Sequence, residues 1–223
     1  LYSILDKIIE NINDGVYEGF NALVKILSLF QRDRSHADSK YLIFYLKFCA
    51  LRHSGEESFH ERFIQIWAKF LKNTEFDQKR SDFFCCWFLL ELLTKSLMLK
   101  NENVDIDSLN YITSTLSSYL PKFRDSGQYI GNAINKHLCF FYKDLFEFVD
   151  HSLVFKMLEQ HINLDLQGTT NLFDRECFRD IISTFISPKI FLYLTAPVGN
   201  SSLFINLFLP HIKSAMNVPE HTN

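Results

Sequence analysis

Apolar residues recur at helical spacing in segment after segment of this chain, and this pattern favours an assembly of helices over any other fold. In the segment 57–72, Phe59, Phe63, Trp67 and Phe70 lie three or four positions apart and therefore share one helix face. The alternation of apolar and polar residues that is typical of strands is not seen. Only 7 glycines and 5 prolines occur in 223 residues, so long helices with short connections are expected.

The pattern predicts nine helices and a tenth, irregular one. They cover residues 1–12, 16–30, 40–52, 57–72, 81–100, 108–120, 129–149, 152–162 and 172–186, and the irregular helix covers 201–213, where Pro210 interrupts it. The helix 81–100 is apolar nearly all round at its start, so we expect it to be central and buried. We expect Asp107 to cap the helix 108–120, and Asp150 or Ser152 to cap the helix 152–162.

Antiparallel helices joined by short loops favour an all-α fold, with helical hairpins stacked as an armadillo- or HEAT-like α-solenoid. We expect one helical region over residues 1–213 and a frayed tail over 214–223. No repeat of fixed period is visible, so the repeats would be degenerate, and a compact all-α bundle stays open as an alternative. Leu1 already lies within a helical pattern, so we expect the chain to be a piece of a larger protein.

The charge and the cysteines exclude several classes of protein. With 23 basic and 26 acidic residues the net charge is −3, which argues against a nucleic-acid-binding module. The longest apolar run, 83–90, is far shorter than the roughly 20 residues of a membrane-spanning helix. The five cysteines lack the spacing of a disulfide framework, so we expect free buried thiols in the cytoplasm. They are Cys49, Cys85, Cys86, Cys139 and Cys177.

Metal-binding patterns begin in two places and fail in both. His60-Glu61 could open a zinc motif, but Ile64 stands where the second histidine is needed. Cys85 and Cys86 are adjacent on a helix and diverge by about 100°, so they cannot easily hold one ion. His137 and Cys139 diverge in the same way.

Catalytic patterns are also missing. There is no nucleophile elbow and no glycine-rich phosphate loop. Asp105 and Asp107 lie in a polar segment and are interpreted as capping or solvated residues, and Glu91 with Lys95 as a structural ion pair. The sequence therefore predicts no catalytic, cofactor-binding or metal-binding residue, and no cofactor.

Three blocks carry a resemblance to a known family. The first is the run Trp87 to Leu97, with Glu91 before Lys95-Ser96. The second contains Asn135, Leu138, Phe140, Phe141, Asp144, Leu145, Asp150, Val154 and Phe155, and the third contains Asp180, Ser187, Leu194 and Pro197. In order and spacing these blocks resemble the dedicator-of-cytokinesis (DOCK) family, in its C and D (zizimin-like) subfamilies, over roughly residues 57–197.

The chain departs from that family at two points inside the matching stretch. His151-Ser152 stand where the family usually has Arg-Gly, and the run 188–191 replaces a His-Glu-His-Tyr run. The first 55 residues match the family only in character. The chain therefore resembles a divergent member or a distant relative.

The resemblance implies a role in small-GTPase signalling. DOCK proteins are cytoplasmic guanine nucleotide exchange factors for Rho-family GTPases, chiefly Rac and Cdc42. The matching stretch corresponds to their helical armadillo-like region, which lies between a lipid-binding and an exchange-catalysing homology region. The resemblance thus implies a non-catalytic scaffold that contacts protein partners, reaches the GTPase through an exchange domain outside this chain, and could form a homodimer.

Two other functions stay open at this stage. An unrelated armadillo- or HEAT-like interaction scaffold would show a concave face with exposed aromatic or charged residues. A helical domain of an enzyme would show a deep pocket with convergent polar groups.

Overall fold

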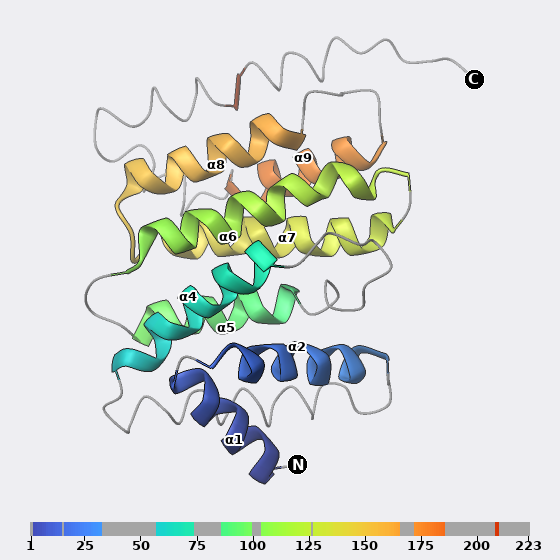
Figure 1. Cartoon of the computed structure of the whole chain (residues 1–223). Helices are drawn as coiled ribbons and strands as arrows, with labels where there is room; N and C mark the ends of the chain where they lie inside the picture. Colours follow the sequence, from blue (N-terminus) through green and yellow to red (C-terminus); the bar gives the residue numbers. More distant parts are fainter. Residues whose placement is uncertain are drawn as a thin grey trace. The chain divides into compact units, whose positions relative to one another are not determined.

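The computed structural model describes residues 2–14, 16–32, 57–73, 86–99, 104–125, 127–165, 172–185 and 208–209, and within these ranges all regular structure is helical (Figure 1). The helices are α1 (Tyr2–Asn13), α2 (Tyr17–Arg32), α4 (Glu57–Asn73), α5 (Cys86–Leu99), α6 (Ile106–Tyr119), the 3-10 helix η3 (Leu120–Phe123), α7 (Gln128–Leu145), α8 (His151–Asp165) and α9 (Leu172–Phe185). The prediction of an all-α fold of helical hairpins is confirmed.

The chain divides into two compact units, with the division inside α6. Unit 1 is Leu1–Thr115 and unit 2 is Leu116–Asn223. The last residues of α6 therefore pack with unit 2. The predicted single region over 1–213 stays a prediction.

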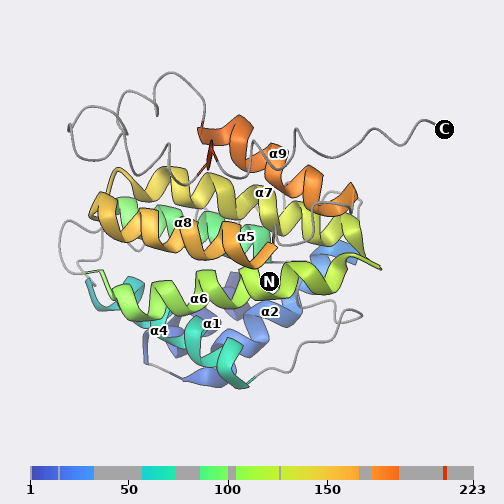
Figure 2. The same cartoon turned by 90° about the horizontal axis from the view of Figure 1, so that it is seen from above.

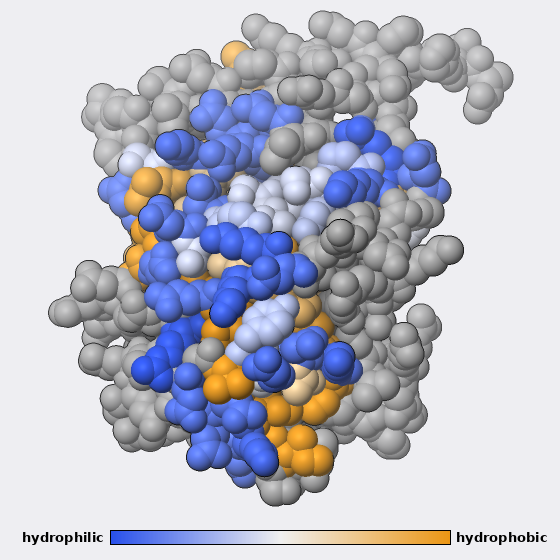
Figure 3. Space-filling view, viewed as in Figure 1, coloured by the Kyte–Doolittle hydropathy of each residue, from blue (hydrophilic) through white to orange (hydrophobic). Residues whose placement is uncertain are grey.

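Unit 1 is built on an apolar core. Helix α1 packs on α2, both pack on α4, and α4 packs on α5. Phe63, Trp67 and Phe70 are almost completely buried, so the aromatic stripe of 57–72 is core at these positions. Phe20 of α2 packs against this stripe, and the centroid of the Phe20 ring lies 5.8 Å from that of Phe63 and 5.4 Å from that of Phe70. Figure 3 shows apolar patches on the visible face around α1, α2 and α4, and Ile4, Val16 and Met98 are exposed apolar residues of unit 1.

Unit 2 is organised around α7, which packs on α9, α8 and η3 (Figure 2). A glycine permits the closest of these contacts. A Cβ atom on Gly131 would lie 2.6 Å from Cζ of Phe173 and 2.8 Å from Cβ of Phe123. Gly127 precedes the helix with φ of 74°, a left-handed conformation that side chains disfavour.

Most predicted helices agree with the structure to within a few residues, and two predictions are corrected. The helix predicted over 129–149 ends at Leu145, because residues 146–149 turn the chain towards α8. Asp107 is not the cap of α6. The helix begins earlier, at Ile106, and the Ser108 amide donates to Asp105 Oδ1 at 3.0 Å.

The cap of α8 is Asp150, one of the two residues predicted for this role. Its Oδ1 accepts hydrogen bonds from the Ser152 amide at 2.9 Å and from the Ser152 hydroxyl. The prediction of a buried helix at 81–100 also holds for the described part, since eight of the described side chains of α5 are buried, among them Leu92 and Leu93 at 0 % exposure.

Several predictions lie outside the described residues. These are the helix 40–52, the helix 201–213 apart from 208–209, the tail 214–223, Cys49, Cys85, and the side chains of Phe59 and Lys95. The other three cysteines, Cys86, Cys139 and Cys177, are free and buried, as predicted. Among the described helices, none is both long enough and apolar enough to cross a membrane.

Candidate functional site

The strongest convergence of polar side chains among the described residues lies in the core of unit 2. Ser117 of α6, Asn135 of α7 and His161 of α8 are each 0 % exposed. They come from three helices and lie 18 and 26 residues apart in sequence. Buried polar groups need partners, because an unpaired one in the interior is costly.

These side chains form a continuous chain of hydrogen bonds, which we call the polar chain. Ser117 Oγ lies 2.6 Å from His161 Nδ1, and His161 Nε2 lies 3.1 Å from Asn135 Oδ1. Asn135 Nδ2 in turn donates to the Cys177 carbonyl of α9 at 3.2 Å. Tyr142 Oη is a more distant neighbour, 3.5 Å from Ser117 Oγ. Four helices are thus joined by one chain.

The chemistry of the end groups fixes the direction of every bond. Because the amide nitrogen of Asn135 donates to a carbonyl, its oxygen faces His161 and accepts a proton from Nε2. His161 is therefore the Nε2–H tautomer, and its Nδ1 accepts from the Ser117 hydroxyl. The Tyr142 hydroxyl is left to donate to Ser117 Oγ. Each polar atom in the series has a role that matches its chemistry.

Burial lowers the pKa of His161 from 6.5 to about 3. The imidazole is fully enclosed, and desolvation disfavours its charged form. His161 is therefore neutral at physiological pH, as the tautomer assignment requires.

The order of groups in the polar chain is that of a hydrolase triad, with a hydroxyl, an imidazole and an amide. A triad acts only where a substrate can reach the hydroxyl. Ser117, His161 and Asn135 have no exposed surface, so no substrate carbonyl can approach Ser117 Oγ in this structure. The arrangement holds α6, α7, α8 and α9 in one register and is a structural feature.

Asp180 of α9 extends the polar chain towards the surface. Burial raises the pKa of this half-buried carboxyl, while the charges of Arg179 and Lys136 and a hydrogen bond from Asn135 act in the opposite direction. Beside it, Asn132 Nδ2 donates to Glu176 Oε2 at 2.7 Å. These contacts form a polar border along the α7–α9 contact.

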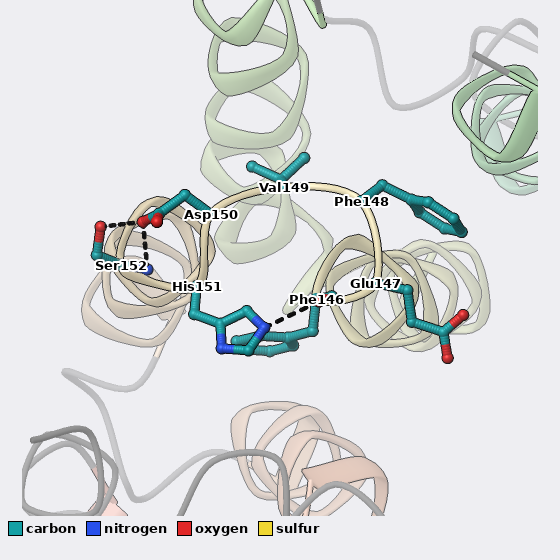
Figure 4. Close-up of a pocket in the computed structure, with 7 residues that line it drawn as sticks. All are labelled: Phe146, Glu147, Phe148, Val149, Asp150, His151 and Ser152. Atoms are coloured by element: carbon teal, nitrogen blue, oxygen red, sulfur yellow. Dashed lines mark hydrogen bonds between the residues drawn. The ribbon is translucent and has the colours of Figure 1, made fainter. Parts of the chain in front are cut away.

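A second candidate is the open pocket at the connection between α7 and α8, lined by residues 146–152 (Figure 4). His151 Nε2 lies 3.0 Å from the Phe146 carbonyl, to which it donates. Hydrogen bonds from Ser152 lower the pKa of Asp150. Figure 4 shows the carboxylates of Glu147 and Asp150 pointing to opposite sides of the turn, so they do not converge on a ligand.

An ion pair connects η3 to the start of α9. Arg124 Nε lies 2.7 Å from Asp174 Oδ1, and the Asp174 side chain is only 2 % exposed. The second oxygen, Oδ2, is buried without a hydrogen-bond partner. The pair fixes the first turn of α9 beside η3, next to the close contact at Gly131.

The structure separates the residues that the sequence suggested as pairs. Burial raises the pKa of Asp105, but hydrogen bonds from Ser108 and Gln65 outweigh it and lower the pKa, as a cap requires. Glu91 is half-buried, and its predicted pairing with Lys95 stays a prediction. Within the described ranges no group of three or more His, Cys, Asp or Glu side chains could hold a metal ion.

Sequence reasoning missed Ser117 and His161. Both lie on apolar faces, where Leu120 and Leu158, each three positions away, are also fully buried. A polar residue that interrupts an apolar stripe is the available signal. It indicates a buried hydrogen bond, but the partner on another helix is known only from the structure.

The second block of the family resemblance, over residues 135–155, belongs mainly to this same core. Asn135 is a member of the polar chain, and Leu138, Leu145 and Val154 are almost completely buried. Phe140, at 37 % exposure, and Asp150 are exposed, and Asp144 is half-buried. This block therefore consists mainly of residues that determine packing.

Comparison with known proteins gives one match. A family model described as "DOCK6-11, TPR domain" matches residues 1–175. This range includes the first 55 residues, where the sequence alone suggested only a likeness in character. No curated protein and no solved structure is significantly similar to the chain.

Proposed function

The chain belongs to the DOCK family through its match to the DOCK6-11 TPR domain, and from this premise we propose that it is a non-catalytic helical scaffold segment of a DOCK-type guanine nucleotide exchange factor. The factor acts on Rho-family GTPases, Rac or Cdc42, in small-GTPase signalling. The observation that carries the proposal is the family match, which covers α1 to α8 and the start of α9.

The finer assignment is to the C and D subfamilies. It is supported by the three collinear sequence blocks, of which the second contributes Asn135, Leu138 and Phe155 to the core of unit 2. The departure at His151-Ser152 falls on the first two residues of α8, which are half-buried and exposed respectively, so it lies outside the buried core.

The segment itself does not catalyse exchange. Nucleotide exchange needs a surface that displaces GDP and magnesium from the GTPase, and the resemblance assigns this surface to a separate homology region.

The partners are proteins. The GTPase is reached through the exchange region of the parent protein, and the helical units offer surfaces for further protein partners or for a second copy of the chain in a homodimer. The parent is cytoplasmic and is recruited to membranes through its other regions. The near-neutral charge supports a protein partner over a nucleic acid.

The first experiment follows the transcript beyond the codon for Asn223 and expresses the longer product. Release of a fluorescent GDP analogue from purified Rac and Cdc42 is then measured with the 223-residue chain, with the longer product, and with the longer product lacking residues 1–223. We expect the chain alone to leave the intrinsic rate unchanged and both longer products to accelerate release.

Two results would contradict the proposal. Accelerated release by the 223-residue chain alone would refute a non-catalytic role. A transcript without a downstream exchange region, with no effect of any product on either GTPase, would refute the assignment to an exchange factor.

A further inference from the structure

The outward faces of α7 and α9 form one continuous surface of unit 2. The two helices run parallel, because the contacts between them advance together, from Gly131 against Phe173 to Asn135 against Cys177. An α-helix turns by about 100° for each residue, so the exposed positions of the two helices lie about 100° to opposite sides of these contacts. In parallel helices this arrangement turns both exposed faces to the same side.

The exposed charges on this surface are of one sign. Every exposed charged side chain of α7 and α9 is basic, and these are Lys136, Lys143, Arg175 and Arg179. The acidic side chains of the same helices are buried or half-buried, and these are Asp144, Asp174, Glu176 and Asp180. Because the whole chain has a net charge of −3, this surface is a local separation of charge. The next exposed charge along the chain, Glu147, lies beyond the end of α7 and limits the surface.

Large apolar side chains are exposed among these cations. Tyr129 and Leu172 are 59 % and 66 % exposed at the N-terminal ends of the two helices, and Phe140 is 37 % exposed further along α7. Aromatic side chains and arginine are both enriched where proteins bind one another. We call the four cations and these three apolar residues together the basic face.

We propose that the basic face is a docking site for an acidic segment of a partner protein. Carboxylates of the segment pair with Lys136 and Arg179, and its apolar side chains contact Tyr129 and Leu172 at one end and Phe140 at the other. The proposal rests on the scaffold role proposed above, for which it names the surface and the chemistry of the partner. Its test uses no GTPase, so it can fail while the assignment to an exchange factor stands.

The carboxylates within the basic face favour a protein over a lipid surface or a nucleic acid. Asp180 is half-buried there, and the charges of Arg179 and Lys136 both act on it. A membrane or a phosphate backbone presents negative charge continuously, so it would also meet Asp180 and be repelled. A protein segment can place its carboxylates over the cations alone.

The position of the Phe140 ring supports the same choice. The Lys136 ammonium lies 5.9 Å from its centroid, and the His137 ring lies 6.2 Å away at an interplanar angle of 79°. Both neighbours belong to the preceding turn of α7, so the ring lies along its own helix. A ring in this position offers a flat contact to a partner and does not project as insertion into a bilayer requires.

The test measures the binding of a fluorescent helical peptide to the full chain by anisotropy, in about 50 mM salt. The peptide is built on alanine, with glutamates along one face and a leucine at each end of that face. A control peptide has glutamine in place of every glutamate. We expect the control to bind about tenfold more weakly, and the difference to disappear in about 0.5 M salt, which screens exposed charges.

A matched pair of double variants tests the cations. Lys136→Ala with Arg179→Ala removes two charges of the basic face, and Lys25→Ala with Lys156→Ala removes two exposed charges of α2 and α8. The first variant should bind the glutamate peptide about fivefold more weakly, and the second should stay within about twofold of the wild type.

A second matched pair tests the apolar contacts. Phe140 in the basic face and Leu153 on α8 are both 37 % exposed. Phe140→Ala should weaken binding about fivefold, and Leu153→Ala should leave it unchanged. Tyr129→Ala, at a more exposed position, should weaken binding in the same direction as Phe140→Ala. Far-UV circular dichroism checks that each variant remains helical.

Four outcomes would overturn the proposal. The glutamate peptide does not bind at concentrations up to about 1 mM. The glutamate and glutamine peptides bind equally. The variants of the basic face lose no more affinity than their controls. In the fourth, the chain sediments with phosphatidylserine vesicles through Lys136 and Arg179 and the peptide does not compete, which would make the basic face a membrane-binding surface.

Discussion

The two units bury their polar residues in opposite ways. In the described part of unit 1 the buried polar side chains are Thr94 and Thr113, and each bonds to its own helix. Thr94 Oγ1 donates to the Leu90 carbonyl at 3.1 Å, and Thr113 Oγ1 to the Leu109 carbonyl at 3.1 Å. In unit 2 the polar chain instead connects side chains from different helices.

This difference changes what determines the arrangement of the helices. Apolar packing depends on volume and shape and tolerates several solutions of similar energy. A chain of directed hydrogen bonds is satisfied in one register only, because a shift leaves buried donors and acceptors unpaired. We therefore expect unit 1 to be sensitive to lost volume and unit 2 to lost hydrogen-bond partners.

The largest effect is expected from Trp67→Ala in unit 1. The side chain is fully buried and contacts Phe63, with ring centroids 6.3 Å apart. Truncation should cost about 3–5 kcal/mol of unfolding free energy, since the cavity closes only in part. Urea unfolding measures the loss, and hydrogen exchange should place it in α1, α2, α4 and α5. A greater loss of hydrogen-exchange protection in unit 2 would contradict the expectation that lost volume affects unit 1.

The next effect is expected from Asn135→Ala in unit 2. The change leaves His161 Nε2–H without its acceptor, while the Cys177 carbonyl remains the acceptor of the helix amide at position 181 within α9. One buried unpaired donor should cost about 1–3 kcal/mol. The exposed neighbour Lys136→Ala is the control and should stay within about 0.5 kcal/mol in urea unfolding. Equal losses of stability for the two changes would show that the polar chain makes no measurable contribution to the free energy of unfolding.

Acid should weaken unit 2 through His161. The pKa of this group is about 3 in the folded chain and 6.5 as its ordinary value, so below pH 6.5 the unfolded chain binds the extra proton. Stability is fully present above pH 6.5 and falls by about 1.4 kcal/mol for each pH unit below it, until pH approaches 3. At pH 4.5 the loss should reach about 3 kcal/mol.

The matched variant for this titration is His161→Gln, which removes the ionisable group. Asp180, whose pKa is raised by burial, acts in the opposite direction, because the folded chain keeps its proton to a higher pH. Asp105 and Asp150 have lowered pKa values, so they titrate below the interval from pH 4.5 to 7 in which His161 acts. The free energy of unfolding, measured in urea between pH 4.5 and 7, should therefore depend more steeply on pH in the wild type than in His161→Gln. Identical slopes of unfolding free energy against pH would show that His161 does not cause the pH dependence.

The predictability of the two units from sequence differs for the same physical reason. Apolar periodicity locates helices such as 57–72 and 172–186 to within one residue. It misplaced the end of α7, because Phe146 and Val149 stay buried in the turn and continue the apolar pattern. The polar chain could not be predicted, because Ser117, Asn135 and His161 meet only through the tertiary fold.

One feature common to both units should weaken the contrast between them. Gly19 of α2 and Gly131 of α7 each sit where a Cβ atom would be too close to a neighbouring helix, 2.7 Å from Cβ of Asn11 and 2.8 Å from Cβ of Phe123. Alanine should cost about 1–3 kcal/mol through overpacking, offset by about 1 kcal/mol of better helix propensity. Urea unfolding should show net losses of similar size for both, and a gain at either position would show that its contact can relax.

The smallest effect is expected from Thr94→Val, which has nearly the shape of threonine but no hydroxyl. The Leu90 carbonyl that Thr94 Oγ1 contacts is also the natural acceptor of the helix amide at position 94, so losing the hydroxyl leaves no acceptor unpaired. Stability should change by less than about 0.5 kcal/mol. Ser117→Ala in unit 2 is the counterpart, because it removes the donor to His161 Nδ1 and should cost about 1–3 kcal/mol. The two variants are matched, because both hydroxyls are buried and differ mainly in where the hydrogen bond is made. Equal losses of stability in urea unfolding would show that a helix-internal and an inter-helix hydrogen bond contribute alike.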